Sequence, residues 1–431
     1  MLFLLDLVHS DGRHETVRFD NETNAFFDKD GRRLSFKKKT EIPYRPYTPY
    51  YQPRLRNVRI LTIQLGLKCN KDCEYCHQHG IKKTCPLPDF TPSDVPSFME
   101  RLSSSELSPK EIWFWGGEPL VYWKTLVKLI PPLRARFPNA LMNFPTNGTL
   151  IDEDKVRFLE RYNVGFTVSF GGSYIENGVR HSLLDNERVV MGLRQLRQGA
   201  KFQSILHKDF VPIEKQKEEI ESKRIKIKLI GIHSVVRCNR FNKELADKIL
   251  IPADKRSELE KFVYRVLCSQ DQDANRIHDG LYRRFNVIKA FYECGVGIEH
   301  EYITADCSCP VSDGSDLTID VRGNVLNCYN APMYVLGNIS IMDKTQPKDV
   351  RWLFQNHLFK NKCFCCPYVT ACGSVCPLVH DENSPEFIAT CHNKRIQAAP
   401  FFKKSVEMLF GSTLKMIEEF GTQRVLREFD Y

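Results

Sequence analysis

The sequence predicts an α/β fold in which a mainly parallel β-sheet is covered by helices. Beginning near residue 59, six short apolar segments typical of strands alternate with amphipathic segments typical of helices. Such an alternation favours parallel strands joined by right-handed crossovers. Six repeats are fewer than the eight of a complete TIM barrel. With 431 residues, the chain is long enough for two or three domains.

The expected elements follow one another in a regular order. Strands are predicted in RILTIQLGL (59–67), EIWFWGGEP (111–119), LMNFPTNG (141–148), FTVSFGG (166–172), KFQSILHKDF (201–210) and RIKIKLIGI (224–232). Helices are predicted over Pro92–Ser104, Val121–Phe137, Asp152–Tyr162, Asn186–Gln198 and Ile213–Lys223.

Three cysteines follow the first predicted strand in the run GLKCNKDCEYCHQHG. Cys69, Cys73 and Cys76 have Cys-x3-Cys-x2-Cys spacing. Three thiolates leave one iron of a [4Fe–4S] cluster free to bind a reacting molecule. A structural zinc site would need four protein ligands. The spacing therefore favours a reactive cluster over a disulfide or zinc loop.

In spacing and placement this segment resembles the signature of radical S-adenosylmethionine (SAM) enzymes, in which the open iron takes the amino and carboxylate groups of SAM. The resemblance implies a partial (β/α)6 TIM-like barrel with the ligands at the C-terminal ends of its strands. The second strand is followed by Gly116, Gly117, Glu118 and Pro119. These residues resemble the family's GGEP motif, which holds the SAM ammonium group; outside this context a Gly-Gly pair indicates only a turn.

Later strand ends supply further expected SAM neighbours. The resemblance makes Asn147 a candidate, although Asn147-Gly148 could also form only a tight turn. It makes Ser169 a ribose contact. In the same segment, relatives often have an Asp-Gly pair at the positions that are Gly171-Gly172 here. His207 leaves the fifth strand and could face the pocket or be structural.

A second set of cysteines lies in the C-terminal third and resembles the SPASM extension of radical SAM enzymes, which holds two auxiliary clusters. Zinc-ribbon modules remain an alternative, because they also use Cys-x2-Cys pairs. The adjoining LTIDVRGNVLNC (317–328) predicts a β-hairpin that turns at Arg322-Gly323. By position, the resemblance assigns Cys309, Cys328 and Cys376 to auxiliary cluster I, with Cys307 as fourth ligand and Cys294 competing; Cys363, Cys366, Cys372 and Cys391 are assigned to cluster II. The expected total is three [4Fe–4S] clusters.

Four segments are expected along the chain. Residues 1–55 form a small N-terminal β element and linker, 56–232 the partial barrel, 233–300 a helical bridge and 301–431 the cysteine-rich SPASM domain. The N-terminal element is hypothesised to dock the substrate leader or a small leader-binding partner protein; the alternative is that it simply caps the barrel.

Composition limits the partners and the compartment. The net charge of +9 is spread over several segments, and no reading motif for nucleic acid is found. A mild positive field could dock an acidic peptide or an electron donor such as a flavodoxin or ferredoxin. No apolar stretch approaches ~20 residues, so no membrane span is predicted. The 16 cysteines and the lack of a basic leader predict a cytoplasmic metal-binding protein.

The function implied by the resemblance is that of a radical SAM/SPASM maturase of a ribosomally made precursor peptide. Reductive cleavage of SAM would give a 5′-deoxyadenosyl radical, which takes hydrogen from the peptide and leads to a cross-link or a backbone splice. One alternative is an anaerobic sulfatase-maturing enzyme. Those enzymes are expected to have an Asp base directly after the cysteine that is Cys328 here, whereas this chain has Tyr329. Tyr329 is the catalytic candidate, as a relay of an electron or proton. Another alternative is a non-enzymatic zinc or iron–sulfur scaffold.

Overall fold

The computed structural model separates the chain into two compact units. One, here called the parallel-sheet unit, comprises Thr48–Ser234 and Cys309–Trp352; the other, the helical unit, comprises Met1–Tyr47, Val235–Ser308 and Leu353–Tyr431. The structure describes residues 1–36, 50–51, 55–73, 75–76, 78, 80–81, 87–172, 174–176, 179–236, 243–269, 279–295, 316–330, 332, 334–342, 348–349, 363, 365–372, 381–422 and 424–431.

A nine-stranded sheet forms the centre of the parallel-sheet unit, in the order β12-β11-β8-β7-β6-β5-β13-β14-β15. Each of the six predicted strand segments contributes one strand to it. Neighbouring strands from β5 to β11 pair in parallel. The predicted α/β fold with a parallel sheet is therefore confirmed. The six strands are β5 (Ile60–Gln64), β6 (Glu111–Trp115), β7 (Leu141–Thr146), β8 (Val164–Ser169), β11 (Ala200–Leu206) and β12 (Ile227–Val235).

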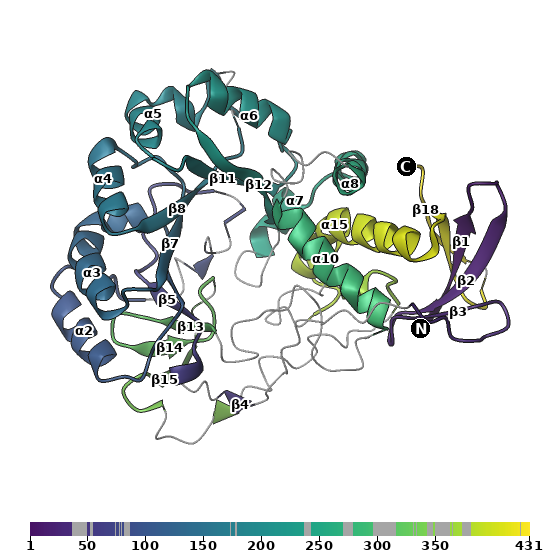
Figure 1. The fold of residues 1–431 in the computed structure, drawn as a ribbon, viewed down its shortest axis with the longest axis horizontal. Coiled ribbons are helices and arrows are strands. Elements are labelled where there is room, and N and C mark those ends of the chain that lie inside the picture. Colours follow the sequence, from purple (N-terminus) through teal and green to yellow (C-terminus); the bar gives the residue numbers. More distant parts are fainter. Residues whose placement is uncertain are drawn as a thin grey trace. The chain divides into compact units, whose positions relative to one another are not determined.

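Helices cover the outer face of this sheet (Figure 1). Their buried residues recur every three or four positions, as in α3, where Leu126, Leu129, Ile130 and Leu133 are fully buried. The Asp152 carboxylate caps the start of α4 by accepting from the Lys155 amide. The helices are α2 (Val95–Ser103), α3 (Trp123–Arg136), α4 (Glu153–Arg161), α5 (Glu187–Arg194) and α6 (Ile213–Ser222), each inside its predicted segment.

The predicted hairpin near Gly323 forms and extends the same sheet. β13 (Asp316–Ile319) pairs antiparallel with β14 (Asn324–Leu326), and β14 pairs with β15 (Val335–Asn338). At the turn, Gly323 has a φ of 75° and Asp320 accepts hydrogen bonds from two backbone amides. β13 also pairs in parallel with β5. Part of the segment predicted as 301–431 therefore lies in the parallel-sheet unit.

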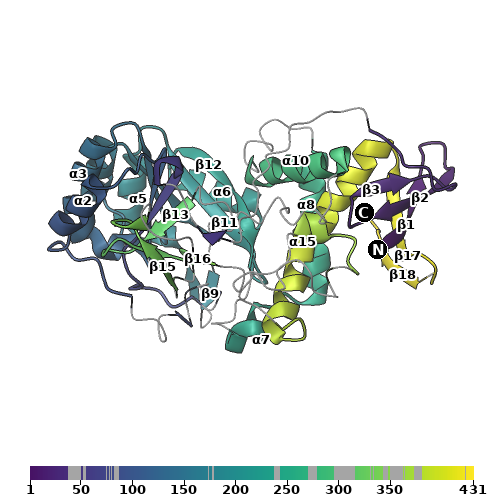
Figure 2. The ribbon, with the colours of Figure 1, turned by 90° about the horizontal axis from the view of Figure 1, so that it is seen from below.

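The helical unit combines long helices with an antiparallel sheet (Figure 2). Its sheet has the order β18-β17-β1-β2-β3, so the N-terminal strands pair with a C-terminal hairpin. Phe19 lies at the centre of an aromatic core with Phe26, Tyr292 and Phe402. Its elements are β1 (Leu2–Val8), β2 (His14–Asp20), β3 (Ala25–Phe27), α7 (Ala246–Ile249), α8 (Ala253–Cys268), α10 (Asp279–Cys294), α14 (Val369–Cys372), α15 (Pro385–Phe410), β17 (Thr413–Glu419) and β18 (Arg424–Glu428).

Shorter elements complete the described chain. They are the 3-10 helices η1 (Leu55–Asn57), η2 (Pro119–Tyr122), η3 (Leu183–Asp185) and η4 (Lys243–Leu245), and the strand pairs β4 (Tyr50–Tyr51) with β16 (Lys348–Asp349) and β9 (Tyr174–Glu176) with β10 (Val179–His181). Among the described helices, none has both the length and the apolar character needed to cross a bilayer.

Candidate functional site

The candidate site lies at the edge of the parallel sheet where the strands end. The cysteine loop follows β5, the GGEP segment follows β6, and Asn147 follows β7. Ser169 is the last residue of β8, and His207 directly follows β11. Because these strands are parallel, their C-terminal ends meet at one edge.

Backbone contacts hold the GGEP segment against the start of the cysteine loop. The Gly117 amide donates to the Gly66 carbonyl at 3.1 Å, and the Glu118 amide donates to the Lys68 carbonyl at 2.9 Å. A side chain on Gly117 would overlap the Lys68 carbonyl, and Gly116 has a φ of 157°. Both glycines are therefore required by the close approach of these two segments.

Glu118 connects the ends of β6 and β7 through a buried carboxylate. Its Oε1 accepts from the Leu120 amide at 3.0 Å and from the Thr146 hydroxyl at 2.7 Å, and its Oε2 accepts from the Asn147 amide at 2.7 Å. Burial raises the pKa of Glu118, against the lowering effect of these hydrogen bonds. Pro119 is buried as the first residue of η2.

Asn147 contacts the cysteine loop with its side chain. Its amide nitrogen donates to Asn70 Oδ1 at 2.9 Å and lies 3.9 Å from Cys69 Sγ. Its carbonyl oxygen accepts from both the amide and the hydroxyl of Thr149. The Cys69 sulfur also accepts from the Lys71 amide at 3.4 Å.

Tyr75, within the cysteine motif, stacks on His207 with ring centroids 5.4 Å apart and an interplanar angle of 18°. The Tyr75 hydroxyl is hydrogen-bonded to Cys73 and interacts electrostatically with Cys76. Burial lowers the pKa of His207, which favours a neutral ring at pH 7. The structure thus brings His207 to the cysteine loop, whereas Ser169 at the end of β8 is exposed.

A polar group that the sequence did not indicate contacts the start of the cysteine loop. The Tyr122 hydroxyl donates to Asp89 at 2.7 Å and accepts from the Lys68 amide at 2.9 Å. Lys68 Nζ forms an ion pair with Asp89 at 2.6 Å. Although burial acts in the opposite direction, the hydrogen bonds from Lys68 and Tyr122 lower the pKa of Asp89. Tyr122 lies in a segment predicted only as helix, so no motif marked it.

Tyr329 lies against the end of β6. Its ring meets Trp115 edge-on, with centroids 4.5 Å apart, and its carbonyl accepts from the Gln78 side chain at 3.2 Å. The preceding Cys328 sulfur accepts from the Asn330 amide at 3.3 Å. The parallel pairing of β13 with β5 is what brings this segment to the same sheet as the cysteine loop.

Four cysteines lie together in the helical unit. Cys363 and Cys391 both pack against the buried Phe387. The Cys366 amide donates to the Cys363 carbonyl at 3.0 Å. Burial, together with the neighbouring Cys372 and Cys391 sulfurs, raises the pKa of Cys366 to about 12. A thiol with this pKa is protonated at neutral pH unless a metal holds it as the thiolate.

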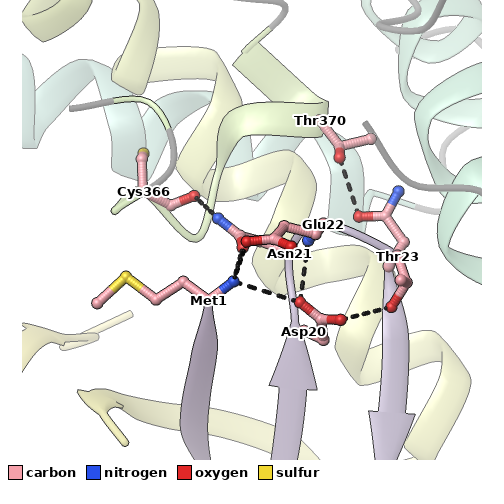
Figure 3. Close-up of polar contacts among 8 residues, drawn as sticks. Met1, Asp20, Asn21, Glu22, Thr23, Cys366 and Thr370 are labelled. Atoms are coloured by element: carbon pink, nitrogen blue, oxygen red, sulfur yellow. Dashed lines mark hydrogen bonds and ion pairs between the residues drawn. The ribbon is translucent and has the colours of Figure 1, made fainter. Parts of the chain in front are cut away.

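The N-terminal strands contact this cysteine segment directly (Figure 3). The Asn21 side chain is fully buried and donates to the Cys366 carbonyl at 2.9 Å. The Thr370 hydroxyl donates to Asn24 Oδ1 at 2.9 Å. Residues 1–36 therefore help to fix the turn that carries Cys366 and the helix that carries Cys372.

Three of the predicted cluster ligands, Cys307, Cys309 and Cys376, lie outside the described residues. Cys365 is exposed, as expected for a cysteine outside the ligand set. Among the described side chains, no three His, Cys, Asp or Glu converge as they would on a single metal ion. An iron–sulfur cluster does not need such convergence, because its thiolates bind different iron atoms.

Residues 63–198, which contain the cysteine loop and the first four strand ends, match the model of the radical SAM superfamily. This segment is a radical SAM domain. This matched segment covers β6, β7, β8 and the last two residues of β5, together with the residues described above at the ends of these strands.

Two curated relatives are similar to part of this chain. The radical SAM cyclopropyl synthase TigE of Paramaledivibacter caminithermalis is 24% identical over 187 residues, which is 39% of each protein. The probable GTP 3′,8-cyclase of Methanothermobacter marburgensis is 31% identical over 111 residues, which is 25% of this chain and 34% of the cyclase. The chain thus spans only about two fifths and one third of these two proteins.

Solved structures match a larger part of the chain at lower identity. Native anSMEcpe with bound AdoMet and Cp18Cys peptide has a TM-score of 0.52 and 17% identity, over 82% of this chain and 99% of the other. Native anSMEcpe with bound AdoMet has a TM-score of 0.50 and 18% identity, again over 82% of this chain and 99% of the other. At this identity the likeness supports the fold.

The family implies a [4Fe–4S] cluster and SAM, and the residues of the cysteine loop fit them. The donor set of this loop is three thiols, the chemistry that an iron–sulfur cluster requires. The Lys71 amide and the Asn147 side chain both direct N–H groups to the Cys69 sulfur, where they would stabilise a thiolate.

Proposed function

We propose that this chain is a radical SAM enzyme, a SPASM-type maturase that modifies a ribosomally made precursor peptide by cross-linking or backbone splicing. The observation that carries the proposal is the gathering of Cys363, Cys366, Cys372 and Cys391 in the helical unit. These four thiols provide a second site, in addition to the cysteine loop, at which an iron–sulfur cluster could bind. With Cys307, Cys309, Cys328 and Cys376 as a third set, the proposed total is three [4Fe–4S] clusters.

The residues at the sheet edge have separate tasks in this proposal. When bound, the cluster and SAM supply a 5′-deoxyadenosyl radical able to take a hydrogen atom from an unactivated carbon. Glu118 already accepts three hydrogen bonds, and a carboxylate has about four acceptor positions. One position remains for the SAM ammonium group. Tyr75 and His207 provide an aromatic surface beside the thiols.

A peptide substrate is supported by two further points. One solved neighbour, anSMEcpe, holds AdoMet together with a peptide. The net charge of +9 suits an acidic peptide or an acidic electron donor such as a flavodoxin or ferredoxin. Since residues 1–36 contact the Cys366 turn, the N-terminal element is proposed to support that turn, and a leader or a leader-binding partner protein would bind its exposed side.

Tyr329 favours cross-linking or splicing over formation of formylglycine. A sulfatase-type oxidation needs a base to take a proton from the substrate as the electron leaves. A tyrosine packed edge-on against Trp115 is a poor base at neutral pH. Tyr329 is therefore proposed to border the substrate and relay an electron or proton.

Mass spectrometry with two candidate substrates tests this proposal. The purified enzyme, SAM and a reductant would be incubated separately with the precursor peptide encoded beside its gene and with a sulfatase-motif peptide. We expect a mass change only in the precursor peptide. Conversion of the sulfatase-motif peptide to formylglycine, with the precursor unchanged, would replace the proposal with sulfatase maturation.

Metal analysis after anaerobic purification distinguishes the enzyme from a metal scaffold. About twelve irons per chain with matching sulfide support three [4Fe–4S] clusters. Stoichiometric zinc in the C-terminal cysteines would instead support a structural role for this region.

A further inference from the structure

Two polar groups in the helical unit face the four cysteines without a task in the chemistry described above. Tyr292 on α10 is 1% exposed, and its hydroxyl proton has no acceptor within the described residues. The Ala371 amide donates to the oxygen of that hydroxyl, and the Cys366 and Cys372 sulfurs interact with it electrostatically. A buried hydroxyl proton without an acceptor is costly, which indicates that an acceptor belongs there.

Arg395 approaches the same cysteines from the surface. It lies four residues after Cys391 on α15, and so on the same face of the helix. Its guanidinium hydrogen-bonds the Cys391 sulfur and also interacts electrostatically with Cys366 and Cys372. Because this residue is exposed, water and salt weaken its charge.

Both groups are donors, and the cysteine sulfurs with which they interact can accept hydrogen bonds. A [4Fe–4S] cluster with four thiolate ligands is an anion that becomes more negative when it is reduced. Hydrogen bonds to its sulfurs and nearby positive charge stabilise the reduced form and raise the reduction potential. Four protein thiolates also occupy all four irons, so such a cluster has no open position for a substrate.

We propose that Tyr292 and Arg395 donate hydrogen bonds to the sulfurs of an iron–sulfur cluster held by Cys363, Cys366, Cys372 and Cys391, and that they raise its reduction potential. This inference rests on the proposed auxiliary cluster. It assigns the site to one-electron transfer rather than to substrate binding: the cluster takes up one electron from the substrate radical and returns it to an electron-carrier protein.

A redox titration of the reconstituted full-length protein, followed by electron paramagnetic resonance, tests the inference. The relevant signal is the one that disappears in the Cys366→Ala/Cys372→Ala variant. We expect Tyr292→Phe to lower the equilibrium constant for reduction about threefold, or ~28 mV for one electron. Arg395→Gln should lower the potential by a similar amount, and Arg395→Lys, which keeps the charge, by less.

Tyr282→Phe is the matched control. It removes a hydroxyl from the same helix, but that hydroxyl donates to the Val266 carbonyl, so the potential should not change. Wild-type potential in an iron-replete Tyr292→Phe protein would overturn the inference. If the Tyr292→Phe protein lost its iron, the reduction potentials of Arg395→Gln and Arg395→Lys would test the inference instead. Wild-type potentials in both of these variants would overturn the inference. Full iron content in Cys366→Ala/Cys372→Ala would instead show that these cysteines hold no cluster, and it would overturn both the proposed auxiliary cluster and this inference.

Discussion

The side-chain amide of Asn147 lies 3.9 Å from the sulfur of Cys69, so the end of β7 touches the cysteine loop that follows β5. The orientation of the amide is fixed by its neighbours. Its nitrogen donates to Asn70, and its oxygen accepts from Thr149. Asn147 therefore presents a fixed N–H group to a residue that is expected to bind iron.

We predict that Asn147→Ala slows the formation of 5′-deoxyadenosine from SAM about tenfold. A hydrogen bond to a charged group contributes about 1.5–3 kcal/mol, and ~1.4 kcal/mol corresponds to a factor of ten in rate. The rate would be measured under excess reductant by chromatography. Asn338→Ala is the control, because its amide bonds Arg322 and Asn324 in the β13–β15 hairpin. Equal rates in the two variants would contradict a role for Asn147.

His207 should make the stability of the parallel-sheet unit depend on pH. Burial lowers the pKa of His207 below its ordinary 6.5, so the folded state favours the neutral ring. Its stabilising contribution is thus complete above pH 6.5 and is lost as the pH falls through the lower, folded-state pKa.

The measurement is denaturant unfolding between pH 7.5 and pH 5, monitored with signals that report on the parallel-sheet unit. His207→Phe keeps a ring against Tyr75 but cannot titrate. We expect the free energy of unfolding to fall less steeply with acid in His207→Phe than in the wild type. The same slope in both proteins would show that the folded state does not shift the pKa of His207.

The N-terminal strands should control how firmly the helical unit retains iron. Asn21→Ala removes the buried donor to the Cys366 carbonyl and should destabilise that turn by about 1–3 kcal/mol. We expect faster loss of iron to a chelator in Asn21→Ala than in Glu22→Ala. Glu22 is an adjacent residue whose half-exposed carboxylate pairs only with the N-terminal amine in the described contacts. Identical iron release from both variants would show that the N-terminal strands do not affect how firmly the cysteines retain iron.

The order of the sheet strands and covering helices from 59 to 223 could be predicted because each of these segments carries its own pattern, whereas the short β9–β10 pair was not predicted. Apolar runs such as ILTIQ predicted buried strands, and the spacing of Leu126, Leu129 and Leu133 predicted a helix. Pairing between distant segments carries no such local signal. The parallel contact of β13 with β5 and the antiparallel contact of β1 with β17 were therefore not predicted.

The same limit applies to the candidate site. The cysteine spacing and the GGEP segment marked residues that lie at one sheet edge, because parallel strands end together. The Tyr75–His207 stack, the Tyr122–Asp89 pair and Tyr292 depend on side chains that meet across the fold. Arg395 differs from these residues. Its position four residues after Cys391 would have placed it on the same helix face, once that segment was known to be helical.

Tyr329→Phe should leave SAM cleavage unchanged. The substitution keeps the ring that packs against Trp115 and removes only the hydroxyl. We expect the wild-type rate of 5′-deoxyadenosine formation and a changed distribution of peptide products, measured by mass spectrometry. Loss of SAM cleavage in Tyr329→Phe would mean that the hydroxyl acts before the substrate step.

The most direct test replaces Cys69, Cys73 and Cys76 with Ala and measures 5′-deoxyadenosine under reductant. The wild-type protein should form it, whereas the triple variant should form none, because its only substitutions remove the thiols that are proposed to hold the reactive cluster. Its C-terminal cysteines are unchanged, so it should retain the iron bound there. Continued cleavage of SAM by the triple variant would contradict the assignment of the reactive cluster to this loop.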